Sequence, residues 1–234
     1  MFLRRYEMTF RLPNVGESVF VTGNPKSGKT TLARWLAKEW AKYHKHVLIF
    51  MSDCELGAKT WADYCKYVIP ANRATINSIA TCLMAGEGWV CIDAHEMAPG
   101  KPLLKLWETV CAVAKAVGNT LVINDEISRV SLGPHMQMGN YAPYHYLLVS
   151  GNGRKRANSI IQATQKPQGC HTDIRDMAHH QFYFRLDDRI VSNYLTYLDK
   201  AELITRLPAY HCMYKHITEG GQVVFEMLKP CPIV

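Results

Sequence analysis

The sequence predicts an α/β fold with a mainly parallel central sheet flanked by helices, on the strength of three observations. Short apolar segments alternate with amphipathic segments along the chain, as strands alternate with helices in parallel sheets. Glycines and prolines fall at the ends of several of these segments, where turns are favoured. Of the 234 residues, 48% are hydrophobic, which is enough for one domain with a large core.

Hydrophobic periodicity places the expected elements in order. In the segment 30–44, Leu32, Leu36 and Trp40 fall on one helical face. Strands are expected at 18–23, 46–51, 89–93, 120–126, 159–165, 181–186, 210–217 and 222–229. Helices are expected at 30–44, 58–68 (before Pro70), 75–85, 102–117 and 143–150.

The chain is expected to form a single domain over 1–234. Residues 1–17 are expected to be a short N-terminal extension, and the weakly periodic region 127–142 an irregular loop. A Glu-Gly-Gly turn at 219–221 separates the last two strands and predicts a hairpin. We expect this hairpin to be an antiparallel addition at one edge of the sheet.

Composition narrows the functional class without defining it. The formal net charge of +7 and the pI near 9.0 fit a polyanionic partner, although charge says nothing about fold. None of the eight cysteines has C-x-x-C spacing, so reduced thiols in a reducing compartment are expected rather than a disulfide framework or a zinc site. No signal peptide is evident, and no apolar run approaches the roughly 20 residues of a membrane span. We therefore expect a soluble protein without a transmembrane segment.

The segment 23–30, GNPKSGKT, matches the P-loop (Walker A) pattern G-x-x-x-x-G-K-[ST], between an expected strand and an expected helix. In such a loop, backbone N–H groups and the helix N-terminus hold phosphate oxygens. Lys29 is expected to reach the β- and γ-phosphates, and the Thr30 hydroxyl to bind Mg²⁺. The residues expected to bind ATP are Gly23, Asn24, Pro25, Lys26, Ser27, Gly28, Lys29, Thr30 and Thr31.

An Asp-Glu pair ends the apolar strand expected at 120–126 and matches the acidic (Walker B) residues that P-loop enzymes need. Asp125 is expected to hold the Mg²⁺ shell, and Glu126 to orient and deprotonate the attacking water. A general base beside the metal ligand favours hydrolysis over phosphoryl transfer, and no arginine-rich lid typical of small-molecule kinases is evident. No Asn-Lys-x-Asp guanine reader is present, so ATP is the expected nucleotide.

With a P-loop at 23–30 and an Asp-Glu pair at the end of a later strand, the chain resembles the FtsK–HerA superfamily of DNA-pumping ATPases. It is most similar to the genome-packaging ATPases of tailless icosahedral viruses with an internal membrane. The resemblance implies a RecA-like P-loop NTPase of the additional-strand catalytic-glutamate type. The segments that carry the resemblance are GNPKSGKT (23–30), KLWETVCAVAKAVGNTLVINDE (105–126), GRKRANSIIQATQKP (153–167), FYFRLDDRIVSNYL (182–195) and LPAYHCMYKHI (207–217).

The resemblance also implies roles for matching residues. Arg154 corresponds to an arginine that acts in trans on the ATP of a neighbouring subunit, with Arg156 as the rival candidate. Gln165 corresponds to a glutamine that senses the γ-phosphate. The chain departs from the family pattern at Asn124, where an apolar residue is usual, and in the loop 127–142.

The implied function is an ATP-driven double-stranded DNA translocase that packages a viral genome into a preformed capsid. It would form a ring, with a hexamer as the expected size, and use ATP and Mg²⁺. DNA contacts would be independent of sequence, and candidate DNA-facing residues are Arg4, Arg5, His135 and Lys155. Capsid or membrane-vertex proteins are expected partners, and the virion packaging vertex or the host cytoplasm the expected location.

Three other interpretations are open. A Zot-like phage morphogenesis ATPase normally carries a membrane span, which is not evident here. A cellular HerA-type translocase carries an N-terminal barrel, whereas only about 17 residues precede the first expected strand. A P-loop kinase or a nucleotide-binding structural subunit would belong to a different functional class.

Overall fold

The computed structural model describes residues 12–52, 61, 64–86, 88–131, 133, 137–150, 155–198, 200–217 and 223–228. The strands in this part of the chain are β1 (Ser18–Thr22), β2 (His46–Met51), β3 (Cys65–Pro70), β4 (Trp89–Asp93), β5 (Thr120–Asn124), β6 (Ser159–Thr164), β7 (His180–Phe184), β8 (Cys212–Ile217) and β9 (Val223–Leu228). The α-helices are α1 (Lys29–Ala41), α2 (Ile76–Met84), α3 (Lys101–Val117), α4 (Met138–Tyr141), α5 (Pro143–Val149), α6 (Thr172–Asp176) and α7 (Asp188–Tyr194). Short 3₁₀ turns are η3 (Ala71–Arg73), η4 (Ile127–Arg129), η6 (Pro167–Gly169) and η7 (Ala201–Arg206).

All the described strands belong to one sheet, in the order β3-β4-β2-β5-β6-β1-β7-β8-β9. The pairs from β3 to β7 are parallel, whereas β7–β8 and β8–β9 are antiparallel. The predicted mainly parallel sheet with a C-terminal hairpin at its edge is therefore confirmed. β6 lies between β1 and β5, which is the additional strand that the resemblance implies.

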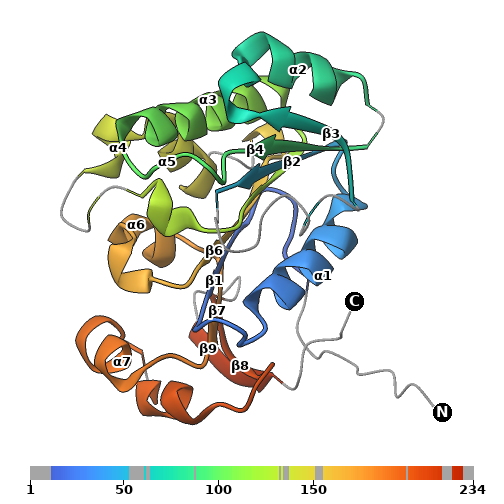
Figure 1. Cartoon of the computed structure of the whole chain (residues 1–234). Helices are drawn as coiled ribbons and strands as arrows, with labels where there is room; N and C mark the ends of the chain where they lie inside the picture. The colour runs from blue at the N-terminus through green and yellow to red at the C-terminus, as the bar shows by residue number, and fades with distance from the viewer. Residues whose placement is uncertain are drawn as a thin grey trace.

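Helices cover both faces of the sheet, with α1 on one face and α3, α5 and α6 on the other (Figure 1). Leu32, Leu36 and Trp40 of α1 are buried in the same cluster as Val19 and Val21 of β1. The intervening Phe20 belongs to the other core cluster, which also contains the buried side chains of α3. Because both faces are covered, both sets of alternating side chains are buried in β1, β2, β5, β6 and β7.

The helices predicted at 30–44, 75–85, 102–117 and 143–150 are confirmed as α1, α2, α3 and α5. Their ends follow local signals in the sequence. Thr75 caps α2 by accepting from the backbone N–H of Ser78 at 3.1 Å, and Pro102 lies in the first turn of α3.

The helix predicted at 58–68 is wrong where it can be compared with the structure, because Cys65–Pro70 is a strand, β3. The segment CKYVIP contains Tyr, Val and Ile, which favour strands, and it pairs in parallel with β4. β3 lies at the edge of the sheet, where a proline is tolerated. Residues 53–60, 62 and 63 lie outside the described residues.

The region 127–142, predicted as an irregular loop, contains two short elements. η4 directly follows the Asp-Glu pair, and α4 covers Met138–Tyr141. Met138 is buried in the core, so part of this region packs against the domain.

The described part of the chain agrees with the reduced cysteines expected from the sequence, and its helices bear on the expected absence of a membrane span. The cysteines there, Cys65, Cys82, Cys91, Cys111, Cys170 and Cys212, are all free. None of the helices found there has both the length and the apolar character needed to span a bilayer.

Glu17, just before β1, carries a buried carboxylate held by hydrogen bonds. Its Oε2 accepts from the backbone N–H of Asn14 at 2.7 Å and lies 2.8 Å from Nε2 of His180. Nδ1 of His180 in turn lies 2.6 Å from the hydroxyl of Tyr214. Burial raises the pKa of Glu17, but the bonds from His180 and Asn14 outweigh it and lower the pKa from 4.5 to about 2.

Replacing Glu17 by glutamine is expected to destabilise the fold in a pH-dependent way. Since the folded pKa lies below the unfolded one, the ionised carboxylate contributes fully above about pH 4.5, and its contribution is lost as the pH falls toward 2. Urea unfolding should therefore show the largest difference in free energy between wild type and Glu17→Gln near neutral pH, and a smaller one below about pH 4.5. Glu39→Gln is the control, because Glu39 pairs with Lys42 on the surface of α1. A difference that stays constant across this pH range would contradict the assignment.

Candidate nucleotide-binding site

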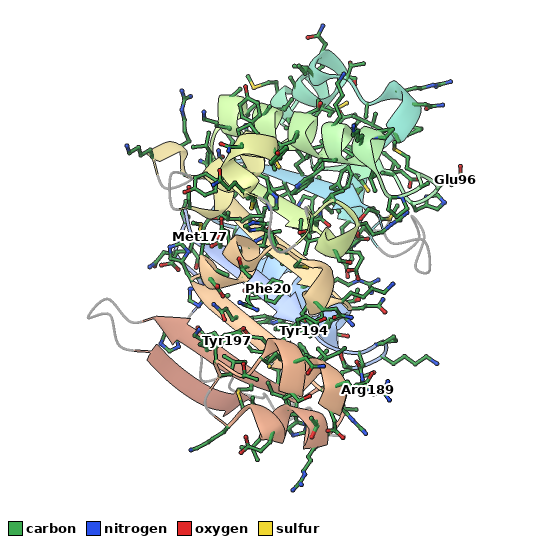
Figure 2. The ribbon with its side chains drawn as sticks, turned by 90° about the vertical axis from the view of Figure 1, so that its left-hand side faces the viewer. Phe20, Glu96, Met177, Arg189, Tyr194 and Tyr197 are labelled. Atoms are coloured by element: carbon green, nitrogen blue, oxygen red, sulfur yellow. The ribbon has the colours of Figure 1, made fainter. Side chains whose placement is uncertain are left out.

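The predicted phosphate-binding residues lie at the carboxyl edge of the parallel strands. Gly23 follows β1, Asp125 follows β5 and Gln165 follows β6, and these three strands are neighbours in the sheet. Figure 2 shows Glu96, which follows β4, and Arg189, which follows β7, along one side of the molecule, with Met177 toward the other. Ligands of α/β sheets bind at the edge where parallel strands end.

The loop between β1 and α1 folds back over the amine of Lys29. Nζ of Lys29 donates to the carbonyl of Asn24 at 2.8 Å, and the N–H of Ser27 donates to the same carbonyl at 3.3 Å. The N–H of Asn24 donates to the carbonyl of Arg185 at 2.8 Å, which anchors the loop beside the end of β7. A cation is thereby held within the loop at the start of α1, where anions are favoured.

Two positions in this loop require glycine. Gly28 has φ +115°, and a Cβ there would lie 2.9 Å from Cδ1 of Tyr210. A Cβ at Gly23 would lie 2.5 Å from Cβ of Phe184 and 2.7 Å from Oγ of Ser27. Backbone conformation and close packing therefore both explain the glycines of the motif.

Ser52, at the end of β2, holds the Asp-Glu pair from a neighbouring strand. Its N–H donates to Oδ1 of Asp125 at 2.9 Å, and its hydroxyl donates to the carbonyl of Glu126 at 3.3 Å. Asn124, the departure from the family pattern, is fully buried, and its Oδ1 accepts from the N–H of Glu126 at 3.1 Å. Asn124 thus belongs to the buried strand and shapes the turn after it.

The carboxylate of Glu126 is buried and oriented by three donors. Oε1 accepts from the hydroxyls of Thr164 and Ser128, each at 2.5 Å. Oε2 accepts from the backbone N–H of Gln165 at 2.9 Å. The two residues at the end of β6 therefore position the predicted general base, which makes the geometry of Glu126 depend on the strand that carries Gln165.

A cavity of about 280 Å³ opens beside this loop. It is lined by Pro25, Lys26, Gly28, Lys29, Thr30, Thr31, Gln165 and Tyr210. The structure thus brings six of the nine predicted ATP-binding residues and Gln165 to one cavity. The other described residues of the predicted site do not line it: Gly23, Asn24, Ser27, Asp125 and Glu126. Oγ of Ser27 is buried within the loop and has no hydrogen-bond partner among the described atoms, but Ser27 does not line the cavity.

A second cavity, of about 410 Å³, lies farther along the same edge, at the ends of β3 and β4. Asp93, His95 and Glu96 line it, and Nδ1 of His95 bonds Oδ1 of Asp93. That contact raises the pKa of His95. This cavity contains none of the predicted nucleotide-binding residues.

The predicted basic residues are only partly described. Lys155 and Arg156 are exposed and precede β6, so they lie at the amino edge, opposite the cavity. Arg154, together with Arg4, Arg5 and His135, lies outside the described residues.

Several residues of this site were not predicted from the sequence. Ser52, Ser128 and Thr164 surround the Asp-Glu pair, and Oδ1 of Asp187 accepts from Nδ2 of Asn24 at 3.0 Å. Tyr210 reaches the loop from beyond η7. Thr164, Asp187 and Tyr210 belong to segments that carry the family resemblance, but nothing in those segments marks them as site residues. Ser52 and Ser128 lie outside these segments, and all five residues meet the site through tertiary contacts.

The strand order and the loop between β1 and α1 define the fold of the P-loop NTPases. Among solved structures, the chain is similar to the genome packaging NTPase B204 from Sulfolobus turreted icosahedral virus 2 in complex with ATPγS, with 18% identity over 94% of this chain and 100% of that chain and a TM-score of 0.67. It is also similar to B204, the DNA-packaging ATPase from Sulfolobus turreted icosahedral virus, with 17% identity over 93% of this chain and 99% of that chain and a TM-score of 0.67. VirB4 of Thermoanaerobacter pseudethanolicus has 9% identity over 92% of this chain and 90% of that chain, with a TM-score of 0.61.

The sequence matches no protein-family model and no curated protein. The predicted resemblance to genome-packaging ATPases is nevertheless confirmed by the structural neighbours. At these identities the neighbours establish a shared fold.

Proposed function

We propose that the chain is an ATPase that translocates double-stranded DNA and packages a viral genome into a preformed capsid. One observation carries the proposal: Lys29, Thr30 and Gln165 line a single cavity, and Gln165 bonds the Glu126 carboxylate. The fold shared with a genome packaging NTPase supports the biological role. We propose that residues 1–234 form one ATPase domain.

The loop 23–30 binds the triphosphate of ATP in this proposal. Lys29 supplies a positive charge to the phosphates, and the α1 N-terminus adds its partial charge. Thr31, next to Thr30 at the start of α1, also lines the cavity.

The donor set fits Mg²⁺, which prefers hydroxyl, carboxylate and phosphate oxygens. Thr30 and Asp125 are the residues that would hold it. When bound, Mg²⁺ neutralises charge on the phosphate oxygens. Ser52 keeps one Asp125 oxygen in place through the 2.9 Å bond to Oδ1.

Glu126 acts as the general base that takes a proton from water. The bonds from Thr164 and Ser128 to Oε1 fix its side chain, and the bond from the Gln165 N–H couples Oε2 to the residue proposed to sense the γ-phosphate. A change in the position of Gln165 would therefore shift the base as well. This coupling gives the proposed sensor a direct physical route to the reacting group.

The active form in this proposal is a ring, with a hexamer expected, in which Arg154 reaches the ATP of a neighbouring subunit. Such a ring uses heterologous interfaces, and an inserted guanidinium stabilises charge on the transferred phosphoryl group. The position of Lys155 and Arg156 at the amino edge of β6 supports this role, because their segment lies away from the cavity of its own chain. Capsid or membrane-vertex proteins remain the proposed partners at the packaging vertex.

The ATPase rate with and without double-stranded DNA tests the function. We expect DNA to stimulate hydrolysis, unrelated DNA sequences to act equally, and stimulation to fall as salt rises, since phosphate contacts release counterions. Single-stranded DNA and a neutral polymer are the controls. Transfer of phosphate to a metabolite would indicate a kinase instead, and hydrolysis indifferent to DNA would contradict translocation.

A further inference from the structure

Tyr210 lies in a turn between η7 and β8 that is tied to the phosphate-binding loop. The N–H of His211 donates to the carbonyl of Pro208 at 3.2 Å and closes the turn. The N–H of Tyr210 donates to the carbonyl of Ser27 at 2.9 Å. A residue remote in sequence is thereby held at the nucleotide cavity by a backbone bond.

The backbone of Tyr210 is in a left-handed conformation, with φ 64°. Bulky residues rarely adopt this region, and they do so where the surrounding structure imposes it, often at ligand-binding sites. Lys26 lines the same cavity and also has a positive φ, of 60°. Two such residues at one cavity indicate a shape built for a ligand.

The aromatic ring lies directly over Gly28. A Cβ on Gly28 would be 2.9 Å from Cδ1 of the ring, yet Tyr210 remains 38% exposed. It lines the cavity, so an apolar face is held open at its rim instead of being buried in the core.

Gln165 and Tyr210 lie at opposite ends of the cavity, on opposite sides of β1. Gln165 follows β6, which lies on one side of β1. Tyr210 packs at Gly28 beside Phe184 of β7, on the other side of β1. A nucleotide with its terminal phosphate near Gln165 therefore has its base on the side of Tyr210.

We propose that Tyr210 binds the base of the nucleotide by stacking its ring on the face of the base. This inference rests on the proposed ATPase function, because the phosphates must occupy the loop 23–30. Stacking on an aromatic side chain suits any base, and the fixed backbone of Tyr210 keeps the ring in place before the ligand arrives.

Binding of two probes tests the proposal: the β,γ-methylene analogue of ATP, which has a base, and inorganic tripolyphosphate, which has none. Calorimetry with Mg²⁺ gives the Kd of each probe for wild type, Tyr210→Ala and Tyr210→Phe. Tyr210→Ala should weaken the ATP analogue by about 5- to 150-fold and leave tripolyphosphate unchanged. Tyr210→Phe keeps the ring and should bind both like wild type.

Tyr43→Ala is the matched control, because Tyr43 is 61% exposed just beyond the end of α1. Thermal unfolding of each variant checks that the fold is intact. Equal weakening of both probes by Tyr210→Ala would show that the ring only supports the loop and would overturn the inference. Unchanged binding of both would also overturn it, by placing the base elsewhere. Wild-type protein that binds neither probe would instead overturn the proposed function itself.

Discussion

Glu126→Gln is expected to abolish most ATP hydrolysis while leaving ATP bound. The amide oxygen can still accept from the N–H of Gln165, and the amide NH₂ can donate to the hydroxyls of Thr164 and Ser128, which replace the bonds made by the carboxylate. The amide cannot take a proton from water. Loss of a general base lowers the rate by about 10²- to 10⁴-fold, so kcat should fall by that factor while the Kd for ATP changes little.

Steady-state phosphate release and calorimetric ATP binding, measured on the same preparations, check this result. Glu108→Gln is the matched control: the Glu108 carboxylate of α3 also accepts backbone N–H groups, from Tyr144 at 3.0 Å and His145 at 3.3 Å, but Glu108 lies within α3 and is not part of the predicted site. If Glu126→Gln hydrolysed ATP at the wild-type rate, Glu126 would not be the base. If binding were lost as well, its role would be structural.

Lys29→Ala is expected to weaken nucleotide binding and hydrolysis together. The Lys29 side chain is buried, and its bond to the carbonyl of Asn24 keeps the amine inside the loop. Removing one preorganised donor from a developing phosphate charge lowers the rate by about 10²- to 10³-fold.

Thermal unfolding with and without MgATP measures the expected loss of nucleotide binding. A ligand at about 100 times its Kd stabilises a folded protein by about 2.7 kcal/mol, so ATP should raise the Tm of wild type but not that of Lys29→Ala. Lys42→Ala is the control, because Lys42 follows α1 and pairs with Glu39 on its surface. An ATP-dependent rise in Tm equal to that of wild type would rule out contact between Lys29 and the phosphates.

Short-range signals made the predicted part of the site accessible from the sequence. The loop 23–30 needs glycine at a positive φ and a lysine at the helix start, and these requirements fall within eight consecutive residues. The Asp-Glu pair at 125–126 follows the apolar run Leu121–Ile123 of β5, a strand in which every side chain is buried because both faces of the sheet are covered. Adjacent residues carry both signals, so no tertiary contact is needed to recognise them.

Long-range packing decided the rest. The segment Cys65–Pro70 forms a strand that pairs with β4. The hydrophobic periodicity of one segment does not show which strand it will pair with. Insertion of β6 between β1 and β5 brought Thr164 and Gln165 to Glu126.

The position of Tyr210 could not be predicted from the sequence. It depends on a turn, a backbone bond to Ser27 and the absence of a side chain at Gly28. The sequence by itself determined the mainly parallel α/β fold and the residues expected to hold phosphate. Only the tertiary structure decided which side chains orient the base Glu126 and which aromatic ring stands at the rim of the cavity, because those contacts join residues far apart in the chain.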